Sequence, residues 1–146
     1  MSMTRAAARD ATAVPLDELL QTSKVVSVHL VASAQTHHLF NAERFAQMRS
    51  DSVFVNTSHP ALVDESALIA ALKSGKPGAA ALDVYSNEPL PPDSELLKAP
   101  NLVLSPHLGF VCKEVLEQFY ADVAESLQAW IDGQALLREV WPLQAN

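Results

Sequence analysis

The stretch SVFVNTSHPALVDESALIAALKSGKPGAAALDV, residues 52–84, contains a strand, a helix and a second strand in succession. Ser52–Asn56 and Ala79–Val84 are short runs of β-branched or small apolar residues, which is typical of buried strands. Between them, Asp64 is placed to cap the start of a helix, and Gly75 marks its end. Because no hairpin turn joins the two runs, we expect parallel strands connected by a crossover helix.

The same alternation of strands and helices continues on both sides of this unit. The run Ala79–Val84 is small and apolar enough to be covered on both faces of a sheet. The sequence therefore predicts an α/β fold with a parallel sheet of about four strands and flanking helices. The further expected elements are a helix over Pro15–Ser23, a strand over Val25–Leu30, a helix over Asn41–Met48 with Asn41 as its N-cap, and a strand over Leu102–Leu104.

A long helix is expected near the C-terminus. From Val111 to Ile131, apolar residues recur at steps of three and four, which predicts one amphipathic helix that ends at Gly133. The expected organisation is a single domain over residues 1–146, with the long helix at 111–133 and a tail at 134–146.

Composition and charge exclude several classes of protein. Apolar residues make up 49% of the 146 residues, which favours a globular domain over a disordered chain. The net charge of −7 argues against nucleic-acid binding. No apolar run approaches the roughly 20 residues that a membrane-spanning helix needs, and Met1–Asp10 lacks the apolar segment of a secretory signal. The single cysteine, Cys112, excludes an internal disulfide and fits a reducing, cytoplasmic compartment.

Polar residues cluster where the expected strands end. Asn56–His59 follows the second strand, Asp83–Glu88 lies at the end of the third, and Ser105–Gly109 follows the fourth. Ligands of open parallel sheets bind outside the carboxyl ends of the strands. The sequence therefore predicts a functional site at this edge of the sheet.

His107 and Glu88 are the sharpest candidates at this edge. A histidine can give or take the hydroxyl proton when a hydride moves to or from a carbinol carbon, and a nearby carboxylate raises its pKa. His107 could equally cap the following helix or bond a loop carbonyl. Asp83 could accept a hydrogen bond from a ligand amide or satisfy backbone N–H groups. No metal site is expected, because the other histidines lie at no ligand spacing from a cysteine or carboxylate.

Several blocks together resemble the D-isomer-specific 2-hydroxyacid dehydrogenases. They are VPLDELLQTSKVVSVHL, VNTSHPALVDESALIAALKSG, AAALDVYSNEPLP and LLKAPNLVLSPHLG, in the family's order and spacing. The resemblance runs from about Thr4 to Gly133. It implies the C-terminal part of a Rossmann-like NAD-binding domain that is missing its first βαβ half. It also implies a fragment of an NAD- or NADP-dependent oxidoreductase that acts on the CH–OH group of 2-hydroxy acids.

The resemblance assigns roles position by position. His107, in SPHLG, matches the acid/base, and Glu88 matches the partner that tunes its pKa. Asp83 matches the aspartate at the nicotinamide end of the cofactor. The remaining cofactor-binding positions are Thr57, Ser58 and Gly109 around the nicotinamide carboxamide, and His29 and Leu30 beside the adenosine ribose.

The chain departs from the family pattern in two places. His59 stands where the family has the arginine that grips the substrate carboxylate, and Pro60 stands where it has a glycine. No G-x-G-x-x-G occurs among the four glycines, so the loop that holds the cofactor's phosphates is expected to be absent. The family's separate substrate domain is expected to be absent as well.

Two functions follow from these matches and departures. In the first, the chain is part of an enzyme that acts on small 2-hydroxy or 2-keto acids; it is impaired on its own and works with a complementing chain. In the second, it is a non-catalytic remnant or interaction module that needs a partner. A third possibility is self-association as a homodimer, because a half-sheet exposes an unpaired edge strand.

Overall fold

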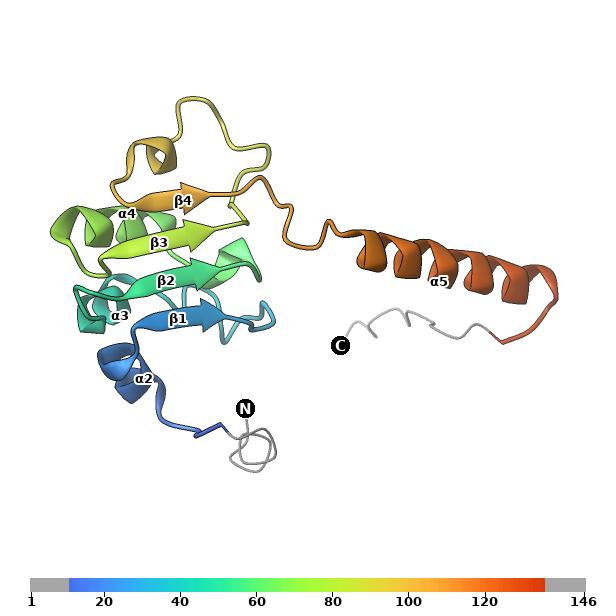
Figure 1. Cartoon of the computed structure of the whole chain (residues 1–146), viewed down its shortest axis with the longest axis horizontal. Helices are drawn as coiled ribbons and strands as arrows, with labels where there is room; N and C mark the ends of the chain where they lie inside the picture. Colours follow the sequence, from blue (N-terminus) through green and yellow to red (C-terminus); the bar gives the residue numbers. More distant parts are fainter. Residues whose placement is uncertain (1–10, 136–146) are drawn as a thin grey trace. The chain divides into compact units, whose positions relative to one another are not determined.

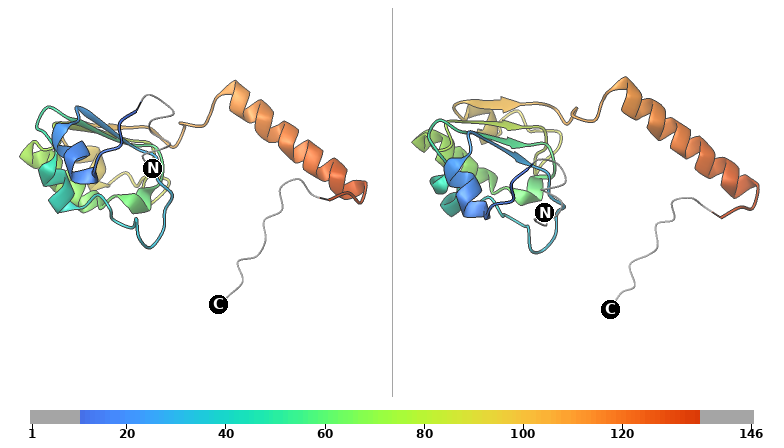
Figure 2. Two further views of the ribbon diagram at one scale, coloured as in Figure 1. Left: turned by 90° about the horizontal axis from the view of Figure 1, so that it is seen from below. Right: turned by 60° about the horizontal axis from the view of Figure 1, so that its bottom comes forward.

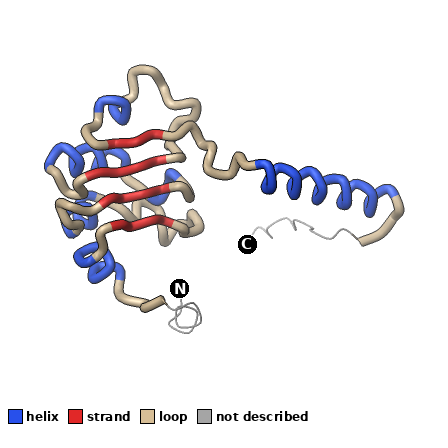
Figure 3. Tube along the Cα trace, in the orientation of Figure 1, coloured by secondary structure: helices blue, strands red, loops and turns tan. Residues whose placement is uncertain are grey.

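The computed structural model describes residues 11–135. They fall into two compact units, and the boundary along the chain lies between Leu108 and Gly109. The first unit carries every strand, and the second carries one helix (Figures 1 and 3). In chain order the elements are α2 (Leu16–Thr22), β1 (Val25–Val28), α3 (Ala42–Gln47), β2 (Val53–Asn56), the 3₁₀ helix η1 (Pro60–Leu62), α4 (Glu65–Ser74), β3 (Ala79–Leu82), the 3₁₀ helix η2 (Glu95–Lys98), β4 (Leu102–Leu104) and α5 (Lys113–Ile131).

The four strands form one parallel sheet in the order β1-β2-β3-β4, which confirms the expected fold class. The first strand ends at Val28 rather than Leu30, and the third ends at Leu82 rather than Val84. Pairing sets these limits, because Val28 pairs with Asn56 and Leu82 pairs with Leu104, the last residues of their neighbours. The residues beyond these pairs therefore form the loops of the carboxyl edge.

One face of the sheet carries the core. The register places Val26 beside Phe54 and Phe54 beside Ala80, and these three side chains are buried in one row. Two further phenylalanines pack against this row: the ring centroids of Phe40 and Phe45 lie 4.9 Å and 5.2 Å from that of Phe54. Burial of these rings holds α3 and α4 on this face.

The other face of the sheet is more open within the described part of the first unit. Within the first unit, α2, α3 and α4 lie on the same face of the sheet (Figure 2). On the opposite side, Val25 is 62% exposed and Val103 is 68% exposed, whereas Ala79 and Ala81 are half-buried. The physical reason is that the crossover helices between these strands all pack against the row that contains Phe54.

Local capping fixes the helix ends as the sequence predicts. The Asn41 side chain accepts a hydrogen bond from the Arg44 N–H at the start of α3, and the Asp64 side chain accepts one from Ala67 at the start of α4. Gly75 ends α4 with φ +82°, in the left-handed region that glycine adopts without strain.

The second unit contains α5, which begins at Lys113 and ends at Ile131, within the expected range 111–133. Its apolar side chains lie along the helix at steps of three and four and are exposed; Phe119, Val123 and Leu127 are examples. Most of the expected tail, residues 136–146, lies outside the described residues. In the part of the chain that the structure describes, no helix is long and apolar enough to cross a membrane.

Candidate active site

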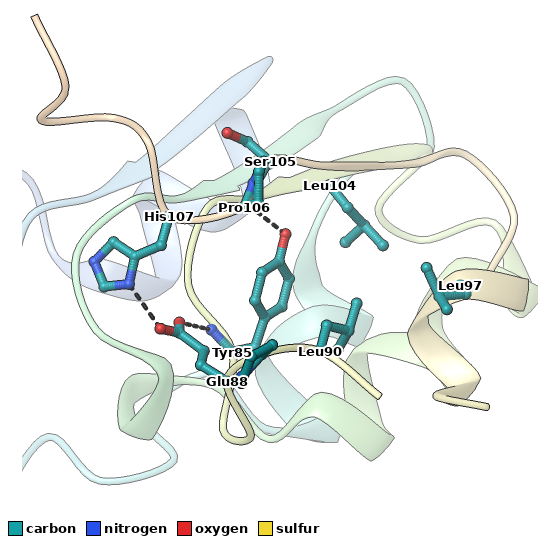
Figure 4. A pocket seen from close by; sticks show the side chains of 9 residues that line it. Tyr85, Glu88, Leu90, Leu97, Leu104, Ser105, Pro106 and His107 are labelled. Carbon is teal, nitrogen blue, oxygen red and sulfur yellow. Dashed lines mark hydrogen bonds and ion pairs between the residues drawn. The ribbon is translucent and has the colours of Figure 1, made fainter. Parts of the chain in front are cut away.

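His107 and Glu88 form an ion pair at the carboxyl edge of the sheet. The His107 Nδ1 lies 2.8 Å from the Glu88 Oε2, and the side chains are 49% and 35% exposed (Figure 4). The second carboxylate oxygen, Oε1, accepts a hydrogen bond from the Tyr85 N–H at 2.9 Å. Both oxygens of Glu88 are therefore held, which fixes the carboxylate against the histidine ring.

Tyr85 ties the loop after β3 to the end of β4. Its hydroxyl group lies 2.6 Å from the Ser105 carbonyl oxygen and 3.1 Å from the Leu82 carbonyl oxygen, and both accept from it. The side chain is buried, so this bond is shielded from water. Sequence reasoning assigned no role to Tyr85; the available signal was a tyrosine placed directly after a buried strand.

The backbone at His107 is unusual. Its φ is +57°, in the left-handed region that residues with a side chain rarely adopt, and its N–H donates to the Ser105 carbonyl oxygen at 2.9 Å. Strained residues of this kind gather at functional sites, where the surrounding structure holds them. The N-cap of α5 is Cys112, so the alternative in which His107 caps that helix is not what the structure shows.

Asp83 is buried at the end of β3 and braces the loop beyond β4. Its Oδ1 accepts a hydrogen bond from the Leu108 N–H at 2.9 Å, and its own N–H donates to the Asn56 carbonyl oxygen at 3.0 Å. Of the two alternatives for Asp83, satisfaction of a backbone N–H is therefore observed for one oxygen. The carboxylate nevertheless lies at the same edge as the His107–Glu88 pair.

Asn56 organises the neighbouring loops. It is 1% exposed; its Oδ1 accepts from the Ser58 N–H and its Nδ2 donates to the His59 carbonyl oxygen, both at 3.0 Å. The Ser58 hydroxyl then donates to the Leu30 carbonyl oxygen at 2.7 Å. Sequence reasoning placed Asn56 at this edge without a role, although a polar residue that ends a buried strand is itself a signal.

The remaining candidate residues are distributed as follows. Thr57 is exposed between Asn56 and Ser58. His29 follows β1 directly, and its Nε2 lies 2.9 Å from the hydroxyl group of Ser27 in that strand. Gly109 is the first residue of the second unit, whereas the other candidate residues belong to the first unit. The structure thus brings Leu30 and Ser58 together directly, and Asp83 and Glu88 come close to the residues around His107.

His59 has a structural part in its loop. Its Nδ1 accepts a hydrogen bond from the Ala61 N–H at 3.2 Å, which caps the 3₁₀ helix that begins at Pro60. This bond requires the tautomer whose proton is on Nε2. In this state the ring offers one donor, whereas a guanidinium offers a planar pair.

Electrostatics favour the charged form of both partners in the ion pair. The hydrogen bond from His107, followed by that from the Tyr85 N–H, lowers the pKa of Glu88 below its ordinary value of 4.5. The hydrogen bond to Glu88 raises the pKa of His107 above its ordinary value of 6.5. The pair therefore contributes fully to stability between pH 4.5 and pH 6.5, the ordinary pKa values of the two groups. The histidine part is lost as the pH rises through the raised pKa of His107, and the glutamate part is lost as it falls through the lowered pKa of Glu88.

Glu88→Gln should lower the pKa of His107, because an amide oxygen cannot supply the negative charge that stabilises the imidazolium. The measurement is a pH titration of the His107 ring carbon protons by NMR, in the parent chain and in the variant. A midpoint for His107 that does not move would show that Glu88 does not tune it.

The residues at this edge fit one end of a dinucleotide. The Asp83 carboxylate and the peptide groups around Thr57 and Ser58 are of the chemical kinds that a nicotinamide carboxamide bonds to, although the Asp83 Oδ1 accepts from the Leu108 N–H and the Ser58 N–H donates to the Asn56 Oδ1. For phosphates the fit is poor: the loop segments 29–31, 57–59, 83–88 and 105–108 contain no lysine or arginine. Among the described residues there is also no group of three or more histidine, cysteine, aspartate or glutamate side chains that could hold a metal ion.

The parallel sheet, its crossover helices and the polar carboxyl edge define a dinucleotide-binding type of α/β domain. Residues 2–109 match the NAD binding domain of the D-isomer specific 2-hydroxyacid dehydrogenases. The chain belongs to this family. This confirms the resemblance found in the sequence.

Individual relatives agree with the family match. Glyoxylate/hydroxypyruvate reductase B from Escherichia fergusonii is 45% identical over 118 residues, which cover 81% of this chain and 36% of that protein. The crystal structure of a putative D-3-phosphoglycerate dehydrogenase from Ralstonia solanacearum superposes with a TM-score of 0.84 at 33% identity, covering 90% of this chain and 39% of that one. A D-isomer specific 2-hydroxyacid dehydrogenase from Xanthobacter autotrophicus, in complex with NADPH and MES, gives a TM-score of 0.69 at 35% identity, covering 86% and 51%. The chain thus spans about a third of the length of the curated relative.

Proposed function

We propose that this chain supplies the acid/base part of an NAD- or NADP-dependent oxidoreductase that interconverts 2-oxo and 2-hydroxy acids. The observation that carries the proposal is the His107–Glu88 ion pair, held on a left-handed backbone at the carboxyl edge of a parallel sheet. Family membership and the domain type support the cofactor class.

A dihydronicotinamide bound at this edge would supply the hydride that the carbonyl carbon of the 2-oxo acid needs. Protonated His107 gives its proton to the carbonyl oxygen, which becomes the hydroxyl group, and the ring is left neutral. Glu88 stabilises the imidazolium before transfer and holds the ring through Nδ1, so the exchanging nitrogen is Nε2. In the oxidation direction the same ring takes the hydroxyl proton.

The chain offers few groups that could bind the substrate carboxylate. His59 offers one Nε2–H donor where a bidentate guanidinium would grip a carboxylate, and Pro60 offers no N–H. Loss of a bidentate charged contact commonly costs about a hundredfold or more in rate. We therefore propose that the chain on its own is impaired as an enzyme.

A second candidate is an interaction module that needs a complementing chain or a second copy. The open face of the sheet favours it, because parallel sheets are normally covered on both faces. Val25 on β1 and Val103 on β4 are exposed apolar residues of this face, and each lies on an edge strand. An unpaired edge is a template for another strand. For either candidate we propose a cytoplasmic location, since the single cysteine forms no internal disulfide.

A titration of NADH into the purified chain tests the proposed function. We expect saturable binding, measured by nicotinamide fluorescence and by a rise in melting temperature. Because the fit is at the nicotinamide end, reduced nicotinamide mononucleotide should compete with NADH, and AMP should not. If nothing binds at millimolar NADH, the enzymatic proposal fails for the isolated chain and the interaction module remains.

A further inference from the structure

A cavity of about 500 Å³ adjoins the His107–Glu88 pair. It lies between the loop after β3, the 3₁₀ helix η2 and the end of β4, all within the first unit (Figure 4). Its volume is within the roughly 300–1,000 Å³ that small-molecule sites occupy. The lining residues are Tyr85, Glu88, Pro89, Leu90, Leu97, Leu104, Ser105, Pro106 and His107.

The two ends of this cavity differ in chemistry. His107 and Glu88 form one end, whereas Leu90, Leu97 and Leu104 gather at the other (Figure 4). The Tyr85 ring stands between them. Its hydroxyl group donates to backbone carbonyl oxygens, so the part of Tyr85 left for a ligand is the hydrocarbon ring.

The arrangement suits an amphipathic ligand. The acid head group of a 2-oxo acid is small and polar and would contact His107, while a branched aliphatic or aromatic side chain would remove the leucine side chains from water. Each buried methylene improves binding about fourfold. Glyoxylate, which has no side chain, would leave the apolar end of the cavity unfilled.

We propose that this cavity receives the hydrocarbon side chain of a 2-oxo or 2-hydroxy acid, with the acid head group at His107. The inference rests on the proposed function and adds the substrate class: acids with a branched aliphatic or aromatic side chain. Leu97 is the variant site of choice, because it lines the cavity and is 53% exposed, so the core does not depend on it.

The test compares binding of ketoisocaproate and glyoxylate to the full 146-residue chain by NMR with methyl-labelled leucines. We expect ketoisocaproate to bind at least about tenfold more tightly. It should shift the Leu90, Leu97 and Leu104 methyl signals and the His107 ring signals with the same midpoint. Leu97→Asp should abolish the preference. Leu127→Asp, at a 55% exposed leucine of α5 outside the cavity, should leave it unchanged.

Three results would overturn the inference: equal binding of the two acids, leucine shifts without a His107 shift, or no binding of either acid. An NADH titration of the same sample separates these results from failure of the proposed function. Saturable NADH binding without a preference for ketoisocaproate would remove the side-chain pocket and leave the oxidoreductase proposal standing.

Discussion

Phe54→Ala should lower the free energy of unfolding by about 3–5 kcal/mol, the usual cost of removing a buried phenylalanine ring. Phe54 is 0% exposed at the centre of the core face of the sheet. It contacts Phe40 and meets Phe45 edge to face, with an interplanar angle of 89°. Phe45 belongs to α3, so this contact joins the helix to the sheet. For a domain of this size the loss is a large part of the total stability.

The measurement is chemical denaturation followed by far-UV circular dichroism. The matched control is Val25→Ala on β1, which also shortens an apolar strand residue but at a site that is 62% exposed. This control should change the free energy of unfolding by less than about 0.5 kcal/mol. Equal losses in the two variants would show that the open face, and not the phenylalanine cluster, stabilises the unit.

The elements of the fold could be predicted because local rules decide them. Asn41 and Asp64 cap helices through their own side chains, and Gly75 adopts the left-handed conformation that ends α4. These interactions join residues three or four apart, so the sequence pattern contains them. The parallel order followed from the absence of hairpin turns between the strands.

The coverage of the sheet could not be predicted in the same way. The alternating burial of Ala79–Leu82 comes from the side on which each crossover helix packs, and small residues such as alanine suit a covered and an open face alike. The composition of a strand therefore shows that it can be buried and does not show what covers it.

In the candidate site, too, some contacts could be predicted from the sequence and others could not. The approach of His107 to Glu88 followed from strand ends that share an edge, and the 2.8 Å geometry agrees with it. The bond of Tyr85 to Ser105 joins residues twenty positions apart through the fold, so no local pattern reveals it. Likewise, the hydrogen bond from Ala61 to His59 depends on the tautomer and rotamer of one ring.

His107→Asn should reduce the rate of 2-oxo acid reduction by about a hundredfold to ten thousandfold, the range for removal of a general acid. Asparagine is the sharpest replacement because it tolerates the left-handed backbone better than most residues, and His107 has a φ of +57°. An asparagine amide can hydrogen bond but cannot transfer a proton at neutral pH. The change therefore separates proton transfer from the fold of the loop.

Because this chain spans 36% of the relative from Escherichia fergusonii, the rate is best measured in a chimaera that carries the aligned 118 residues of this chain in that reductase. Both the parent and the variant should carry His59→Arg, so that substrate binding does not limit the comparison. Loss of the bond from Ala61 to His59 costs about 1 kcal/mol, as for other caps, which the chimaera should tolerate. His37→Asn, in an exposed loop, is the matched control and should keep the parent rate. If His107→Asn retains more than about a tenth of the parent rate at an unchanged melting temperature, His107 is not the acid, and the ion pair with Glu88 serves to hold the loop.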